Sequence, residues 1–293
     1  MSFTYMTRND TGSIYIGICL IILLVIMGLR ISNNPEYWFK ENMQSKNEIN
    51  KTIYILWFQG FDSAPPVVKH CVESWKYYNP GWTIVLLDDS NLPDYITLED
   101  YIGDTDINYT ALSDVVRCIL LYKYGGIWAD ATTFCNRPLD EWLPEYCAEG
   151  FFAFSNPGKD RMISTWFLYS EKDHYIMGKL LQSTVKYYKK RDEPDTYFWF
   201  HYLFNQLYAS DFEFHNIWDN VVKIPADGPS YFFKNGFFGK LTPEMKAEID
   251  NKDMPIYKLN YKKEFPEYDE NKLIYYLYNT LTNPITVPEY YQN

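Results

Sequence analysis

The sequence lacks paired cysteines, internal repeats and an excess of positive charge, and each absence excludes a class of protein. None of the five cysteines belongs to a C-x-x-C motif, so a structural zinc site is not expected. No repeat or low-complexity tract appears, which argues against a repeat protein. The formal net charge is −11, and no nucleic-acid partner is expected, because binding a phosphate backbone needs a basic surface.

Apolar and aromatic residues, in contrast, are abundant. Hydrophobic residues make up 47% of the chain and charged residues 22%, which predicts a folded protein with little disorder. Residues 52–293 suit one large α/β domain. Aromatic residues reach 19%, and we interpret most of them as core or half-buried surface and not as sugar-stacking rings. Cys135 and Cys147 form the only disulfide pair that the sequence suggests.

A long apolar run lies near the N-terminus. Residues 13–29 read SIYIGICLIILLVIMGL without a charge, and residues 13–31 are long enough to span a bilayer as a helix. A cleaved signal peptide is the main alternative, but Met27-Gly28-Leu29-Arg30 is a poor cleavage site. We therefore predict a short tail (1–12), a single-pass anchor (13–31) in contact with membrane lipid, and a polar stem (32–51).

The globular part begins with a predicted strand, helix and strand. Thr52 to Phe58, TIYILWF, is a β-branched and aromatic run that predicts a buried strand. A helix opened by Pro65-Pro66 follows and ends at Asn79-Pro80-Gly81, and Trp82 to Leu87 predicts a second strand. Short connections of this kind indicate a parallel sheet with a right-handed crossover, in which ligands gather at the C-terminal ends of the strands.

The later elements continue this mixed pattern. A helix is predicted from about Leu112 to Tyr124, with Ser113 at its start, and a short strand from Ile127 to Ala129 follows the double glycine. Further strands are predicted at 151–154, 162–169, 221–224 and 255–259, and further helices at 173–190, 196–209, 243–250 and 269–280.

The most informative segment is ALSDVVRCILLYKYGGIWADATT, residues 111–133. Asp114 and Arg117 are three residues apart on one predicted helix, so their side chains share a face near its N-terminus and can hold a sugar hydroxyl and a phosphate oxygen side by side. Alone, such a pair is more often a surface ion pair of little energetic value. The double glycine Gly125-Gly126 favours the first interpretation, because a tight turn there delivers Asp130 to a strand end, within reach of a divalent metal or a ribose.

The pattern S-D-x-x-R followed by Y-G-G-I-W-x-D-A-T resembles that of the capsular polysaccharide synthesis protein family. This family is related to glycosyltransferase family 32, which includes yeast mannosyltransferases and the sugar-transferring domains of large clostridial toxins. Similar segments occur in order from about residue 53 to 262. They are ILWFQG (55–60), APP (64–66), ISTWF (163–167), YFWFH (197–201) and PIYKLNYK (255–262).

The resemblance implies a GT-A type nucleotide-diphosphosugar transferase fold, a Rossmann-like mixed sheet flanked by helices. It implies Asp114, Arg117 and Asp130 as catalytic residues. The implied donor-binding residues are Trp57 beside the base, Gln59, Asp114, Arg117, Gly125, Gly126, Lys258 and Lys262. Asp130 corresponds to the first acid of a DXD motif, whereas Thr132 replaces the second and is a poorer ligand for a hard cation. Mn²⁺ or Mg²⁺ bound by Asp130 and Thr132 remains the expected cofactor.

The resemblance therefore implies a glycosyltransferase that moves a sugar from a nucleotide-diphosphosugar donor to a glycan or polysaccharide acceptor, with retention of configuration. The expected localisation is a single-pass membrane protein with a lumenal or external catalytic domain. Lys258 and Lys262 could offset charge on the departing pyrophosphate, although solvated lysines are the default. His201 is as readily a core histidine as a catalytic one. The alternative function, motivated by Thr132, is a catalytically degenerate protein that binds nucleotide sugar or glycan.

Overall fold

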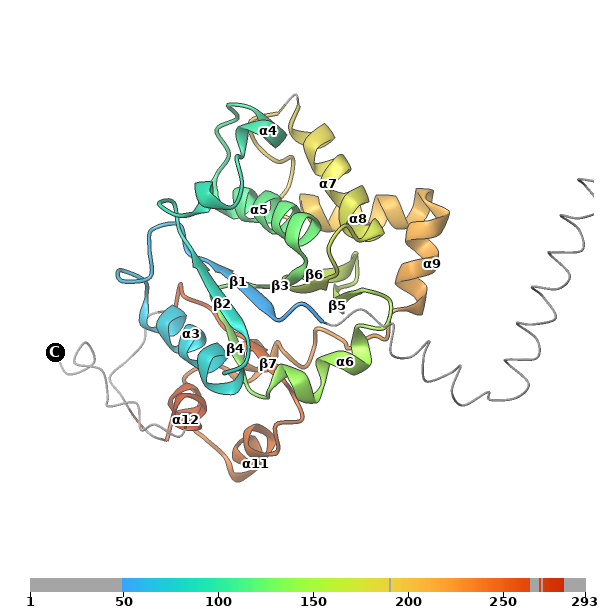
Figure 1. The fold of residues 1–293 in the computed structure, drawn as a ribbon. Coiled ribbons are helices and arrows are strands. Elements are labelled where there is room, and N and C mark those ends of the chain that lie inside the picture. Colours follow the sequence, from blue (N-terminus) through green and yellow to red (C-terminus); the bar gives the residue numbers. More distant parts are fainter. Residues whose placement is uncertain (1–48, 190, 264–268, 270, 282–293) are drawn as a thin grey trace, which may run out of the picture. The chain divides into compact units, whose positions relative to one another are not determined.

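The structure is a computed structural model that describes residues 49–189, 191–263, 269 and 271–281. These residues belong to one compact unit that begins at Ile49, close to the predicted start of the globular domain at residue 52. A five-stranded mixed sheet in the order β2-β1-β3-β6-β5 forms its centre (Figure 1). The strands are β1 (Thr52–Leu56), β2 (Thr83–Leu87), β3 (Gly126–Ala129), β5 (Phe151–Gly158) and β6 (Arg161–Ser170).

The sheet combines a parallel half with an antiparallel half. β1 pairs in parallel with both β2 and β3, whereas β6 runs antiparallel to β3 and to β5. β1 and β2 are joined through helix α3 (Pro66–Tyr78), so the predicted parallel crossover is confirmed. The predicted α/β class is confirmed as a mixed α/β fold with a sheet that contains parallel strands.

Helices cover both faces of the sheet (Figure 1). α5 (Tyr109–Tyr124), α7 (Tyr175–Tyr188) and α8 (Trp199–Ser210) lie on one face, and α3 lies on the other. In α3 the residues at helical spacing, among them Val68 and Trp75, are buried against the sheet side, as an amphipathic pattern requires. The other α-helices of the described residues are α4 (Glu99–Ile102), α6 (Leu143–Tyr146), α9 (Phe212–Asn220), α10 (Tyr231–Asn235), α11 (Pro243–Asn251) and α12 (Leu273–Asn279).

A separate two-stranded sheet joins distant parts of the chain. β4 (Thr133–Cys135) pairs antiparallel with β7 (Ile256–Lys258), so that Thr133 lies opposite Lys258. The N–H of Leu259 donates to the carbonyl of Thr132 at 2.8 Å and extends the pairing towards the end of β3. The β4–β7 pair therefore carries Lys258 to the edge where β3 ends.

Helix α5 begins earlier than predicted. The side-chain oxygen of Asn108 accepts a hydrogen bond from the N–H of Ala111 at 3.1 Å and so caps the helix, whereas Ser113 lies inside it. Asp114 and Arg117 are consequently in the second and third turns. The prediction that they lie at the helix N-terminus was wrong, and they cannot draw on the free N–H groups of that end.

Two further predictions need correction. Residues 221–224 form no regular strand; the segment meets β5 at one isolated parallel bridge, in which the N–H of Ser155 donates to the carbonyl of Ile224 at 2.8 Å and the N–H of Ala226 donates to the carbonyl of Ser155 at 2.7 Å. Cys135 and Cys147 are both free and buried, so the suggested disulfide is absent from the described structure.

The predicted localisation as a single-pass membrane protein also needs correction. Throughout the part of the chain that the structure describes, no helix is both long enough and apolar enough to cross a bilayer. The run on which the prediction depended, residues 13–31, lies outside that part, as do the tail (1–12) and most of the stem (32–51). Membrane localisation and contact with membrane lipid are therefore not carried into the functional interpretation.

Candidate active site

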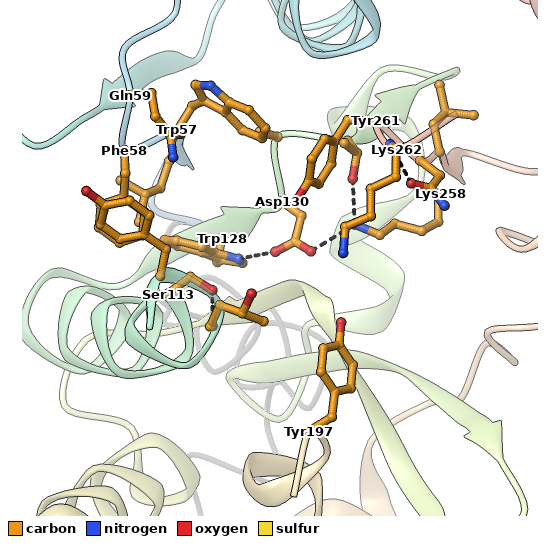
Figure 2. Close-up of a pocket in the computed structure, with 17 residues that line it drawn as sticks. Trp57, Phe58, Gln59, Ser113, Trp128, Asp130, Tyr197, Lys258, Tyr261 and Lys262 are labelled. Carbon is orange, nitrogen blue, oxygen red and sulfur yellow. Dashed lines mark hydrogen bonds and ion pairs between the residues drawn. The ribbon is translucent and has the colours of Figure 1, made fainter. Parts of the chain in front are cut away.

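An open cavity of about 310 Å³ lies where β1 and β3 end (Figure 2). Its volume is at the lower end of the range for small-molecule sites. The carboxyl ends of parallel strands are where ligands were expected to gather. Of the residues predicted to bind donor or metal, those that line the cavity are Trp57, Gln59, Asp130, Thr132, Lys258 and Lys262.

Aromatic side chains form much of the cavity wall. Trp57, which follows β1, meets Tyr261 edge-on with ring centroids 5.1 Å apart, and Phe58 stacks on Tyr109 at 4.4 Å. Tyr197 lies across the cavity from them in Figure 2, and 71% of its surface is exposed. Exposed ring faces of this kind can stack on a nucleobase or on the C–H face of a sugar.

Asp130 is held at the end of β3 by its main chain and by three side chains. Its N–H donates to the carbonyl of Trp166 in β6 at 2.8 Å. Its Oδ1 accepts hydrogen bonds from Trp128 Nε1 at 2.9 Å and from Arg117 Nη2 at 3.2 Å, and its Oδ2 accepts one from Lys258 Nζ at 2.8 Å. The side chain is still 28% exposed, so part of the carboxylate faces the cavity.

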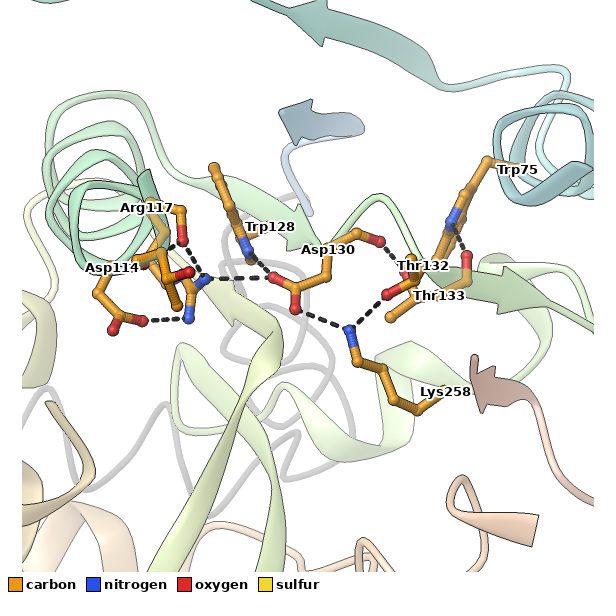
Figure 3. A network of polar contacts seen from close by, with 10 residues as sticks. Trp75, Asp114, Arg117, Trp128, Asp130, Thr132, Thr133 and Lys258 are labelled. Carbon is orange, nitrogen blue, oxygen red and sulfur yellow. Dashed lines mark hydrogen bonds and ion pairs between the residues drawn. The ribbon is translucent and has the colours of Figure 1, made fainter. Parts of the chain in front are cut away.

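Arg117 connects Asp130 to Asp114 (Figure 3). Its Nη1 lies 2.5 Å from Asp114 Oδ1, and its side chain is only 4% exposed. Asp114 lines an adjoining hollow of about 240 Å³, which shares Thr110 and Tyr197 with the main cavity. The three predicted catalytic residues thus lie together, but the guanidinium of Arg117 is buried and engaged with both carboxylates. Their catalytic roles stay predictions.

The pKa values of Asp114 and Asp130 are shifted in opposite directions, although both carboxylates pair with Arg117. Burial raises the pKa of Asp114 to about 6, because the attraction of Arg117 only partly offsets the loss of solvation and the charge of Asp130 adds to the rise. For Asp130 burial also raises the pKa, but the charges of Lys258 and Arg117 outweigh it and bring the pKa down to about 2. Near neutral pH Asp130 is therefore a fixed negative charge.

The double glycine contributes to the fold and not to the cavity. Gly125 and Gly126 have φ values of +70° and +103°, which L side chains rarely adopt. A Cβ on Gly126 would lie 2.7 Å from the carbonyl oxygen of Thr52, so its absence lets β3 pair closely with β1. Both glycines are at the end of β3 away from Asp130, roughly 13 Å along the strand. Gly125 and Gly126 were predicted to bind the donor, but they do not line the cavity.

The donor atoms at Asp130 and Thr132 do not suit a divalent metal. Both carboxylate oxygens of Asp130 already accept hydrogen bonds from cationic or N–H donors, and Thr132 Oγ1 accepts one from Lys258 Nζ at 2.8 Å. Mg²⁺ and Mn²⁺ are bound by carboxylate oxygens that are free to coordinate. Among the described residues, no three His, Cys, Asp or Glu side chains are grouped to hold a metal ion.

Several cavity residues were not predicted from the sequence. Trp128 orients Asp130 through its Nε1 and lies with its ring centroid 5.0 Å from the guanidinium carbon of Arg117. Its place in G-G-I-W-x-D was the available signal. Tyr261 was signalled only by its position between Lys258 and Lys262 in one short segment. Tyr109, Ser113 and Tyr197 also line the cavity and carried no distinct signal.

His201 and the two aspartates that follow β2, Asp88 and Asp89, do not line the cavity. Burial and the neighbouring arginines lower the pKa of His201 in α8 to about 3, so it is neutral near pH 7. Asp88 accepts a hydrogen bond from the N–H of Ser90 at 2.8 Å and closes the turn after β2. Asp89 accepts one from the hydroxyl of Tyr109 at 3.0 Å and supports a cavity residue from behind.

Known proteins show similarity over most of the chain. The chain is 25% identical over 271 residues to the O-glycosyltransferase braB of Annulohypoxylon truncatum, a match that covers 83% of this chain and 55% of that protein. It is 26% identical over 140 residues to the O-glycosyltransferase PaGT of Phomopsis amygdali, covering 40% of this chain and 34% of the relative. The chain thus spans about half the length of the first relative and about a third of the second.

A solved structure and a family model complete the comparison. The PaToxG glycosyltransferase superposes with a TM-score of 0.40 at 16% identity, covering 57% of this chain and 73% of that one. The family model described as capsular polysaccharide synthesis protein matches residues 32–278. This match includes every segment that lines the cavity and most of the sequence. The resemblance seen in the motifs is therefore confirmed: the chain belongs to the capsular polysaccharide synthesis protein family.

Proposed function

We propose that this chain is a glycosyltransferase that moves a sugar from a nucleotide-diphosphosugar donor to a hydroxyl group of a glycan or related acceptor. The observation that carries the proposal is the grouping of Asp130, Lys258 and the Asp114–Arg117 pair around a cavity walled by aromatic rings. The relatives braB and PaGT are named O-glycosyltransferases, which supports transfer to oxygen. A GT-A type arrangement of the mixed sheet belongs to the same proposal.

The donor's parts match different parts of the cavity. The base would stack at Trp57, beside Tyr261, and the diphosphate would meet the ammonium groups of Lys258 and Lys262. The sugar would extend towards Asp114 in the adjoining hollow, where a carboxylate can accept a hydrogen bond from a hydroxyl group. Inside an acidic protein, such local cations are what allow an anionic ligand to bind.

The reaction would break the bond between the anomeric carbon and the diphosphate oxygen. The bonding electrons leave with the nucleoside diphosphate, an acceptor oxygen bonds to the anomeric carbon, and its hydroxyl proton passes to a phosphate oxygen or to solvent. Lysine charges offset the negative charge that develops on the leaving group, and the buried pair fixes the orientation of the sugar. Retention of configuration stays a prediction, which the coupling constant of the product's anomeric proton would test.

The proposal is tested by nucleotide release from a panel of UDP-, GDP-, ADP- and CDP-sugars incubated with the full-length chain. We expect release from at least one donor, and Asp130→Asn should lower its rate by about 100-fold or more, because Lys258 loses its charged partner. The matched control is Asp94→Asn, which changes an exposed aspartate at the end of a short 3-10 helix (Leu92–Asp94) and should act like the wild type.

Two results would count against the proposal. Unimpaired release by Asp130→Asn would remove the cavity from the mechanism. Calorimetric binding of a nucleotide sugar without release over a long incubation would instead favour the alternative, a catalytically degenerate binding protein, which the missing acid at Thr132 motivates.

A further inference from the structure

Lys258 lies at the position where a DXD-type site would hold its cation. Its Nζ is 2.8 Å from Asp130 Oδ2 and 2.8 Å from Thr132 Oγ1, and so bridges the first and third residues of the D-A-T motif (Figure 3). The ammonium group is thus centred between the two side chains that were expected to bind a metal. A cation is present at this point, and the chain itself supplies it.

The main chain fixes this lysine in place. Lys258 is the last residue of β7 and lies opposite Thr133 in the β4–β7 ladder. Its N–H donates to the carbonyl of Pro229 at 2.8 Å, and the next N–H, of Leu259, donates to the carbonyl of Thr132. The side chain is 19% exposed, so it is partly desolvated while its ammonium group still borders the cavity. A lysine held on both sides of its Cα loses little further freedom when it binds an anion.

The charges of the site balance without a metal. Asp114 and Asp130 carry the acidic groups, and Arg117 and Lys258 carry the basic ones, all joined through ion pairs. A divalent ion placed at Asp130 would need a carboxylate oxygen that Lys258 already holds, and would stand beside two cations. The Coulomb repulsion at such distances is several kcal/mol even at an effective dielectric constant of about 20.

We propose that Lys258 replaces the divalent metal of this site, so that the chain binds the diphosphate of its donor with a fixed ammonium group and needs no Mn²⁺ or Mg²⁺. The inference rests on the proposed function, because it takes a nucleoside diphosphate as the leaving group. Lys262 lines the same cavity and adds a second, more exposed positive charge. Asp130 then serves to hold Lys258 and does not coordinate a metal.

The first experiment measures metal binding without any nucleotide. Mn²⁺ is titrated into the full-length chain and the free ion is followed by electron paramagnetic resonance. We expect no binding tighter than about 1 mM for the wild type, since the site offers a single carboxylate that is already ion-paired with Arg117 and Lys258. The double variant Thr132→Asp with Lys258→Met adds a second acid beside Asp130 and removes the cation, and should bind Mn²⁺ at least about tenfold more tightly. Tight Mn²⁺ binding by the wild type would overturn the inference.

The second experiment measures nucleotide binding by calorimetry, with UDP, GDP, ADP and CDP as probes, in EDTA and in MnCl₂. Binding of at least one probe should be equal within about threefold in the two buffers, and Lys258→Met should weaken it by about 10- to 100-fold, as expected for loss of a charge-assisted hydrogen bond. Lys76→Met, which removes an exposed lysine of α3, is the matched control. Thermal unfolding shows whether each variant is folded.

The outcomes separate the two proposals. Nucleotide binding that requires Mn²⁺ would overturn the metal-free inference and leave the proposed function intact. Absence of binding by every nucleotide in both buffers, together with no turnover, would overturn the proposed function and this inference with it. Wild-type affinity in Lys258→Met would also refute the role of the lysine.

Discussion

Replacing Arg117 with methionine tests whether the buried guanidinium holds the two aspartates of the site together. Methionine keeps much of the aliphatic volume and removes the charge. Asp130 keeps Lys258 and Trp128 as partners, whereas Asp114, whose side chain is 10% exposed, loses its salt bridge. Breaking one side of a buried ion pair costs about 3–5 kcal/mol of unfolding free energy. Most of this loss of unfolding free energy should come from the unpaired carboxylate of Asp114.

The size of this loss should depend on pH. The pKa of Asp114 is about 6 with Arg117 present, and removing the positive charge raises it further. At pH 8 the carboxylate is charged and the variant should be less stable than the wild type by about 3 kcal/mol. At pH 5 Asp114 is largely protonated in both proteins, so the difference should shrink to about 1 kcal/mol.

The assay is urea unfolding followed by tryptophan fluorescence at both pH values. Wild type, Arg117→Met, Asp114→Asn and the double variant form a thermodynamic cycle that isolates the pair. Arg191→Met, which removes an exposed ion pair with Asp195, is the control and should change stability by less than about 0.5 kcal/mol. An equal loss at pH 5 and pH 8, or an unchanged loss when Asp114 is already Asn, would refute the reasoning.

Three further predictions concern pH, packing and the donor. The pKa of Asp114 in the folded protein is above its ordinary value, so the contribution of the protonated Asp114 to stability is complete below about pH 4 and is lost as pH rises through about 6. The loss of unfolding free energy is on the order of 3 kcal/mol at most. It should be absent from urea titrations of Asp114→Asn. Gly126→Ala should destabilise the fold by about 3 kcal/mol in thermal unfolding, while Gly81→Ala, whose Cβ meets nothing within 4 Å, should not. Trp57→Ala should weaken calorimetric UDP or GDP binding by about 10- to 100-fold with little change in melting temperature; equal affinity would remove the base from this position.

Local sequence patterns were sufficient to predict the parallel pairing of β1 and β2. The runs at β1 and β2 are short, β-branched and bounded by turn residues, and the helix between them has an apolar face, so their pairing follows from chain geometry. The same patterns mislead where partners are missing. VVKI at 221–224 is mostly apolar and β-branched, yet the segment meets the edge strand β5 only at the bridge between Ser155 and Pro225, and it stays irregular.

The position of Lys258 could not be predicted in this way. β4 has only three residues and exists because β7, far along the chain, pairs with it. No periodicity within either segment specifies that pairing or its register. The sequence suggested that Lys258 approaches a pyrophosphate, but the ammonium group between Asp130 and Thr132 depends on a long-range ladder. The expectation of a metal came from the D-A-T motif by itself, without the lysine that the β4–β7 pairing places beside it.

Three of the exposed aromatic residues give an independent reason to regard the cavity as a binding site. Most rings are core, as composition suggested, but Tyr109, Tyr197 and Tyr261 are 49%, 71% and 43% exposed and all line the cavity. They come from the start of α5, the segment before α8 and the segment after β7. Rings left in solvent contribute little to folding, so their convergence from three distant segments is better explained by a ligand than by packing. A nucleotide sugar presents flat faces for these rings and a diphosphate for Lys258 and Lys262 within one molecule.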